Sequence, residues 1–140
     1  MDKNCVEQEQ AWGHQWCLLC GSKNPRSLHL DFADQDGKVW AVISPGIELQ
    51  GYLGIVHGGI ITSLLDSAMT HCLFKRGIKA LTGDLHVRFY RSVAVGVPVR
   101  ITAWLNFSRP PLYSLKSELF QEGRIAARAE AKFMKQEDLP

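Results

Sequence analysis

The segment that decides the fold runs from Gly58 to Arg76 and reads GGIITSLLDSAMTHCLFKR. Apolar residues surround most of this segment when it is wound as a helix, and a helix that is apolar nearly all round lies buried. Lys75 and Arg76 place positive charge at its C-terminal end, where the helix dipole favours it, and Gly77 is a typical helix stop. The sequence therefore predicts one long helix inside the molecule.

Alternating apolar residues and turn signals on both sides of this helix predict β-strands. The predicted strands span residues 28–32, 38–44, 81–93, 97–107, 112–121 and 124–134. Asp36-Gly37 is the turn of the first pair, and residues 45–54, rich in glycine, form a loop. Short connections imply antiparallel pairing. The predicted fold class is therefore α+β, with an antiparallel β-sheet wrapped around one long central helix.

A chain of 140 residues suits one domain with a single core. We divide it into an N-terminal arm at residues 1–27, a folded domain at residues 28–134 and a tail at residues 135–140. The arm is polar and rich in turns, but Trp12 and Trp16 predict that it docks on the domain.

Composition excludes several classes of partner. A net charge of +2 is too weak to argue for nucleic acid. No apolar run approaches the ~20 residues that span a bilayer, so no membrane partner is expected. The first ten residues do not resemble a signal peptide, and four cysteines do not make a disulfide scaffold. The expected location is the cytoplasm.

The residues that lead into the helix, Gln50–Gly59, read QGYLGIVHGG. Two glycines at a helix start lower helix stability, so they need a reason. One reason is a ligand that approaches the first helical N–H groups, which have no partner within the helix and lie at the positive end of its dipole. The N–H groups of Gly58 and Gly59 could hold a carbonyl oxygen as negative charge develops on it. A tight turn made only for packing accounts for the same glycines.

Asp66 lies in the middle of this apolar helix, where a carboxylate has a large desolvation cost unless it is paired. A carboxylate in such a place is suited to activate water or to attack an acyl carbon. The alternative is a structural aspartate that is satisfied by Thr62 or Thr70, or one that is exposed to solvent.

Helix geometry separates the two candidate groups. Gly58 and Asp66 are eight residues apart, which is about 12 Å of helical rise, so one acyl carbon cannot touch both within a chain. Eight residues is a little over two turns, so both project to nearly the same side. A second helix, packed antiparallel across a two-fold axis, would place one chain's Asp66 beside the other's Gly58. If both groups act together, the protein is at least a dimer with two equivalent sites.

The run Gly54–Gly59 (GIVHGG), followed by Asp66, resembles the signature of hotdog-fold acyl-CoA thioesterases, particularly the phenylacetyl-CoA-thioesterase-like (PaaI-like) branch. The resemblance covers nearly the whole domain. It implies that the Gly58 N–H polarises the thioester carbonyl and that Asp66 is the acid, base or nucleophile. It also implies that Thr82, sixteen residues after Asp66, positions water and that His57 shapes the carbonyl pocket.

The chain departs from the family at one position. Many members carry an Asn shortly before the His, where it contacts the thioester carbonyl, and the nearest amide here is Gln50. Its longer side chain and shifted register change its reach. We expect Gln50 and Gly59 to be substrate-binding residues together with Arg88 and Arg91. The resemblance also implies an acyl-CoA substrate, no separate cofactor, and a homodimer that pairs into a homotetramer.

Coenzyme A carries phosphates that need cations. The candidates are Lys75, Arg76, Arg88, Arg91 and Arg109. Arg88 and Arg91 fall on opposite faces of one predicted strand, so at most one of them lines a given groove. His71 and His86 are interpreted as a helix-surface residue and a strand residue without a catalytic role.

Cys17 and Cys20, in the run CLLCG, have the spacing of half a zinc knuckle. A structural zinc site needs four ligands, and the sequence has no second Cys-x-x-Cys pair. Cys5, His14 or His29 could complete a set, but their spacing is not diagnostic. Similar elements in members of the family need not imply metal. We therefore predict no metal site.

The predicted function is hydrolysis of an acyl-CoA thioester to free acid and CoA. One alternative is a hotdog hydratase or dehydratase, but those enzymes pair a His with an Asp or Glu in a motif that His57 and Asp66 do not match. The other alternative is a non-catalytic acyl-CoA binding module, against which the presence of both Asp66 and Thr82 argues.

Overall fold

A computed structural model describes residues 12–136, and the predictions made for residues 1–11 and 137–140 lie outside the described residues. In chain order the elements are η1 (His14–Trp16), β1 (Ala33–Gln35), β2 (Lys38–Ile43), η2 (Ile47–Leu49), α2 (Gly58–Phe74), β3 (Ala80–Phe89), β4 (Val99–Arg109), β5 (Leu112–Gln121) and β6 (Arg124–Lys135). No helix of the described chain is long and apolar enough to cross a membrane.

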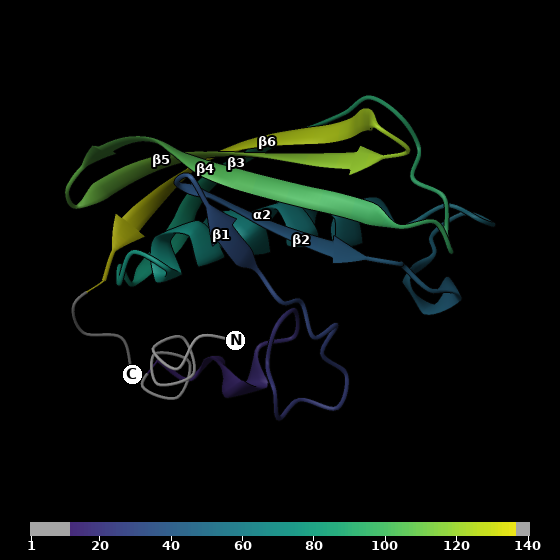
Figure 1. The fold of residues 1–140 in the computed structure, drawn as a ribbon, viewed down its shortest axis with the longest axis horizontal. Coiled ribbons are helices and arrows are strands. Elements are labelled where there is room, and N and C mark those ends of the chain that lie inside the picture. Colours follow the sequence, from purple (N-terminus) through teal and green to yellow (C-terminus); the bar gives the residue numbers. More distant parts are fainter. Residues whose placement is uncertain (1–11, 137–140) are drawn as a thin grey trace.

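The six strands form one antiparallel sheet in the order β1-β2-β4-β5-β6-β3. The sheet curves over α2, and the N-terminal arm lies on the other side of the helix (Figure 1). The predicted α+β fold, an antiparallel sheet around one long helix, is confirmed. Since β3 and β1 are the last strands of the order, each leaves one edge without a strand partner in the described chain.

The core lies between α2 and the inner face of the sheet. Leu65, Ala68 and Met69 of α2 have no exposed surface, and neither do Leu115 of β5 and Phe133 of β6. Side chains alternate between buried and partly exposed along β5, as expected for a strand with one face on the core. Each buried side chain of this size contributes about 1.5–3 kcal/mol to folding. The apolar residues of α2 surround the helix instead of forming one stripe, because the sheet covers one side of it and the arm covers the other (Figure 1).

The predicted strand at residues 28–32 is wrong. Leu30 and Phe32 are buried, so the alternating pattern does report burial. However, His29 has a φ of 50°, in the left-handed region, which interrupts an extended chain. The backbone N–H of Leu30 donates to the carbonyl of Leu19 in the arm, not to a sheet strand. The segment is thus paired with the arm, and the first strand starts only at Ala33.

Other element ends shift by a few residues. The helix ends at Phe74, and Gly77, with a φ of 72°, terminates the turn as predicted. Asp36 and Gly37 have φ values of 54° and 78°, as a two-residue hairpin turn requires. The third strand leaves the sheet after Phe89, because residues 90–93 turn toward the loop before α2. There the Val93 carbonyl accepts the N–H of Val56.

Candidate active site

The start of α2 is capped by its own preceding residue. His57 is the N-cap, and its Nδ1 accepts the backbone N–H of Gly59 at 2.8 Å. The Gly59 N–H is therefore engaged. Among the described residues no hydrogen-bond partner occupies the N–H of Gly58, which stays available at the positive end of the helix dipole. Of the two predicted donors, only the Gly58 N–H is available, because the side chain of His57 accepts the Gly59 N–H.

Gly58 and Gly59 differ in why a side chain is absent at each position. A Cβ added at Gly59 would lie 3.0 Å from Nδ1 of His57, so a side chain there would disturb the cap. A Cβ added at Gly58 would lie 3.8 Å from the ring of Phe89, which is ordinary contact. Packing alone therefore explains Gly59 but not Gly58. A ligand that approaches the Gly58 backbone remains a reason for the smaller residue.

A cavity of about 700 Å³ opens beside Gly58. The residues that line it are Gly51, Tyr52, Ile55, Val56, His57, Gly58, Ile61, Phe89, Tyr90, Arg91, Ser92 and Val93. Its walls are the loop before α2, the first turn of α2 and the segment that follows β3. Apolar and aromatic side chains dominate, with the Arg91 guanidinium as the cation, which is the usual character of a small-molecule site.

The structure brings Asp66 and Thr82 together. The Thr82 hydroxyl donates to Oδ1 of Asp66 at 2.6 Å. The hydroxyls of Thr62 and Thr70 instead donate to the backbone carbonyls of Gly58 and Asp66. The structural alternative, in which Thr62 or Thr70 satisfies the carboxylate, is therefore excluded.

The Asp66 carboxyl is half-buried and its pKa is raised above the ordinary value of 3.8. Burial is the main cause, because it disfavours the charged form. The hydrogen bond from Thr82 acts in the opposite direction, and the charge of Cys17 raises the pKa slightly further. A carboxyl with a raised pKa holds a proton more readily than an ordinary aspartate and is a better general base.

A β-bulge sets the direction of Thr82. Thr82 pairs with Phe133 and Asp84 with Lys132, so Gly83 is an extra residue in β3. An extra residue reverses the alternation of faces beyond it. Both Thr82 and Leu85 can therefore face α2, while Asp84 faces outward. The bulge therefore lets one strand direct Thr82 toward Asp66 and Leu85 toward the core.

The two halves of the predicted site stay apart within one chain. Asp66 and Thr82 are not among the residues that line the cavity beside Gly58. The eight residues from Gly58 to Asp66 lie in one continuous helix, so the separation along its axis is about 12 Å. One chain thus presents the Gly58 N–H beside the cavity and the Asp66 carboxyl about 12 Å away along the helix.

Of the predicted substrate-binding residues Gln50, Arg88 and Arg91, only Arg91 lines the cavity. Gln50 accepts the Gly54 N–H on its Oε1 at 3.0 Å and so braces the loop rather than lining the cavity. Arg91 lines the cavity. Arg88 pairs with Arg128 across β3 and β6, on an exposed stretch outside the cavity.

Nine of the twelve lining residues were not predicted as site residues, and the aromatic and hydroxyl-bearing ones among them are Tyr52, Phe89, Tyr90 and Ser92. The only signal in the sequence is the aromatic pair Phe89-Tyr90 at the end of a predicted strand. Both are about half exposed, and Tyr52 is 86% exposed, although large aromatic side chains are usually buried.

His71 was interpreted as a helix-surface residue, and this is wrong. It is 5% exposed and stacks on Phe32 at 4.6 Å between ring centroids. Burial is the main reason that its pKa falls to about 4, so the ring is neutral. Its Nε2 has no hydrogen-bond partner among the described residues.

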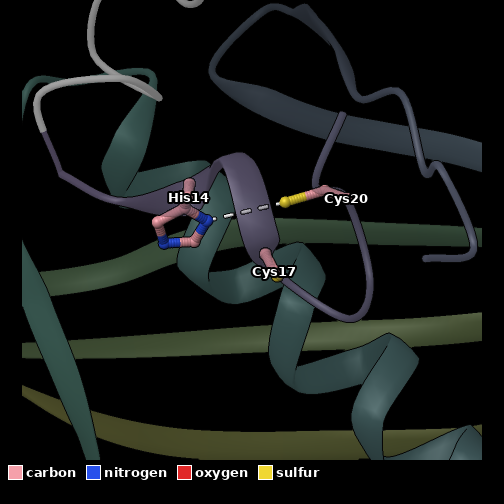
Figure 2. Close-up of side chains that lie close together, drawn as sticks. All are labelled: His14, Cys17 and Cys20. Carbon is pink, nitrogen blue, oxygen red and sulfur yellow. Dashed lines mark hydrogen bonds between the residues drawn. The ribbon is translucent and has the colours of Figure 1, made fainter. Parts of the chain in front are cut away.

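Three arm residues converge beneath α2. The Nδ1 of His14 lies 3.5 Å from the sulfur of Cys20, and Cys17 lies beside them (Figure 2). The Cys20 side chain hydrogen-bonds to Cys17 and is the largest cause that lowers the pKa of the Cys17 thiol to about 3. His29 is not part of this group, and Cys5 lies outside the described residues.

Comparisons with known proteins agree with this fold. Residues 53–124, just over half of the 140-residue chain, match the family model of the thioesterase superfamily. No curated protein matches the sequence. A solved thioesterase superfamily protein, RHA08564, is similar with a TM-score of 0.78 and 23% identity, covering 83% of this chain and 61% of its own. This chain therefore spans less than two thirds of that protein.

Two further structures share the fold over most of both chains. The PaaI protein of the E. coli phenylacetic acid degradation operon has a TM-score of 0.77 and 18% identity, covering 96% of this chain and 99% of its own. Protein smu.793 of Streptococcus mutans UA159, bound to acetyl CoA, has a TM-score of 0.72 and 17% identity, covering 79% and 91%. With its family model matched and its hotdog fold shared with PaaI, this chain belongs to the thioesterase superfamily.

Proposed function

We propose that this protein hydrolyses acyl-CoA thioesters to a free acid and CoA, with each active site shared between two chains. The observation that carries the proposal is the Asp66 carboxyl, which has a raised pKa and a 2.6 Å hydrogen bond from Thr82 inside a thioesterase fold. The unengaged Gly58 N–H supplies the matching electrophilic half.

The proposed reaction begins when the thioester carbonyl accepts a hydrogen bond from the Gly58 N–H. Asp66 of the other chain then takes a proton from a water molecule that Thr82 helps to orient, and the water oxygen attacks the carbonyl carbon. The tetrahedral intermediate carries its negative charge near Gly58 at the helix start. It collapses when the C–S bond breaks, and the proton returns from Asp66 to the leaving thiolate. Direct attack by the Asp66 carboxylate gives the same products through an anhydride that water hydrolyses.

The edge of the sheet supports the shared site. Strand β3, which carries Thr82, has β6 on one side and no strand on the other within the described chain. Leu81 and Phe89 of β3 are 49% and 50% exposed, so this strand carries an exposed apolar side chain near each end. An open strand edge, with its unpaired backbone N–H and carbonyl groups, is a template for pairing with another chain. Pairing two β3 edges about a two-fold axis brings the helices together in antiparallel orientation, as the shared site requires.

The cavity supports an acyl-CoA substrate. Its walls are mostly apolar, which suits an acyl chain, and Arg91 is the predicted CoA-binding cation that lines it. A structure of the same fold is bound to acetyl CoA. We therefore assign the phosphate contact to Arg91 in preference to Arg88.

The test is free-thiol release from a panel of acyl-CoAs of increasing chain length, including aromatic acyl groups. Wild type should release thiol, and Asp66→Asn should lose at least about a hundredfold in turnover. Asp84→Asn is the matched control, because Asp84 lies on the same strand as Thr82 but faces outward beside His86. Consumption of an enoyl absorbance without thiol release would indicate a hydratase, and binding without turnover would indicate a binding module.

A further inference from the structure

The His14, Cys17 and Cys20 side chains form a cluster with the geometry of a metal site. Each offers one ligand atom, and these three atoms all lie within 4.8 Å of one another. In a tetrahedral zinc site, bonds of about 2.0–2.3 Å hold the donors roughly 3.5–3.8 Å apart. The cluster therefore needs to close by only about 1 Å to hold an ion.

The backbone presents the two sulfurs on the same side. The Cys17 sulfur accepts hydrogen bonds from the N–H groups of Leu19 and Cys20, and the Gly21 N–H donates to the Cys17 carbonyl at 2.8 Å. A Cβ on Gly21 would lie 2.5 Å from the Gln15 carbonyl oxygen, so this tight turn accepts only glycine. The Cys20 sulfur points toward the ring of His14 (Figure 2), and the Cys17 sulfur lies within 4.8 Å of both partners.

We infer that His14, Cys17 and Cys20 bind one Zn²⁺ ion, which leaves one tetrahedral position for a fourth donor from outside this set. Two thiolates and an imidazole select zinc over magnesium or calcium, which prefer oxygen ligands. The prediction of no metal site from the sequence stood on the lack of a second Cys-x-x-Cys pair, and His14 replaces one member of that pair. On binding, any proton still held by either sulfur is released to solvent.

A disulfide between Cys17 and Cys20 is the competing use of the pair. The described cysteines contain no disulfide. Moreover, His14 Nδ1 lies 3.5 Å from the Cys20 sulfur, a donor position that a disulfide does not require. The third ligand therefore favours the metal.

The ion would hold the arm in the conformation that packs against α2. The His14 ring lies 5.1 Å from the Phe74 ring of α2, and the Trp12 ring meets Phe74 edge-on at 4.9 Å. Before Ala33 the described chain has one three-residue helix and no strand in the sheet, and the backbone hydrogen bonds of residues 14–30 join residues of that segment to one another. A metal that closes His14 to Cys20 supplies a constraint that regular secondary structure does not. This role is structural and does not depend on the proposed hydrolysis.

The experiment uses the full chain, purified without a histidine tag, reduced, loaded with Zn²⁺ and dialysed. Metal analysis should find one zinc per chain. Titration of the metal-free protein with Co²⁺ should give near-ultraviolet thiolate-to-cobalt bands and intense visible bands of a tetrahedral site. Cys17→Ser and His14→Gln should weaken binding by more than the ten- to hundredfold typical of losing an outer-sphere partner.

Two matched controls should bind as wild type does: Cys72→Ala, a buried thiol of α2, and His86→Gln, an exposed imidazole of β3. Because an arm variant could misfold, the wild type is also compared with and without a chelator. Zinc removal should speed tryptic cleavage at Lys23 and Arg26 while the far-ultraviolet circular dichroism of the sheet is kept. The inference is overturned if wild type holds less than about a tenth of an equivalent of zinc and gives no cobalt bands. It is equally overturned if the ligand variants bind like the controls, or if reduced protein returns to a Cys17–Cys20 disulfide in the presence of zinc.

Discussion

Replacing Thr82 by valine removes the hydroxyl that donates to Asp66 at 2.6 Å and keeps the shape of the side chain. A hydrogen bond to a charged group contributes about 1.5–3 kcal/mol. Thr82 is exposed and Asp66 is half-buried, so solvent screens the interaction and the lower end applies. A loss of about 1.4 kcal/mol of transition-state stabilisation corresponds to about tenfold in rate. We therefore expect Thr82→Val to reduce kcat/KM for the best acyl-CoA by about tenfold.

The pH profile distinguishes this reason from a simple loss of packing. The Thr82 hydrogen bond lowers the pKa of Asp66 against the larger effect of burial. Without it the pKa rises further, so the acidic limb of kcat/KM against pH moves to higher pH. Thr102→Val, on β4 and remote from Asp66, is the control and should leave both rate and limb unchanged. A Thr82→Val enzyme with unchanged rate, or with its acidic limb moved to lower pH, would refute the reasoning.

Three further changes test separate parts of the account. Gly59→Ala places a Cβ 3.0 Å from Nδ1 of His57 and should lower the free energy of unfolding by about 1 kcal/mol, because the helix cap is lost. Gly58→Ala keeps the cap, and urea unfolding measures both variants. Because burial raises the folded-state pKa of Asp66, its charged form destabilises the fold at neutral pH. Asp66→Asn should therefore be at least as stable as wild type at pH 7. The difference in free energy of unfolding between the two should shrink as the pH falls through the raised pKa toward 3.8. Leu81→Lys puts a charge on the open edge of β3 and should convert a dimer to monomers in light scattering, with loss of turnover.

The sequence predicted most of the fold because its signals were strong and local. The apolar helix at residues 58–74 and the strand at residues 112–121 carry clear periodicity and turn residues at their ends. The segment at residues 28–32 has the same alternation, but its backbone pairs with Leu19 in the arm. Alternation reports which side chains are buried. It does not report which backbone accepts the hydrogen bonds.

The candidate site was predicted where chemistry demands an unusual residue. An aspartate in an apolar helix stands out in a sequence, and so do paired glycines at a helix start. Thr82 does not stand out by itself, and only the family resemblance indicated it before its contact with Asp66 was seen. The bulge at Gly83, which aims that hydroxyl, depends on pairing with β6, a strand about fifty residues away. Arg91 lines the cavity and Arg88 does not, because β3 ends at Phe89, between the two residues.

The most direct test of the shared site is complementation between two inactive variants. Asp66→Asn chains keep the Gly58 N–H, and Gly58→Pro chains keep Asp66 but lose that N–H, since proline has none and fits the first turn of a helix. Each variant alone should be inactive. After the two are unfolded together and refolded at equal amounts, half of the dimers are mixed and each mixed dimer holds one intact site. Thiol release should therefore return to about a quarter of the wild-type rate. If native mass measurement shows mixed dimers and thiol release stays at the level of the separate variants, the two halves do not work together across the interface.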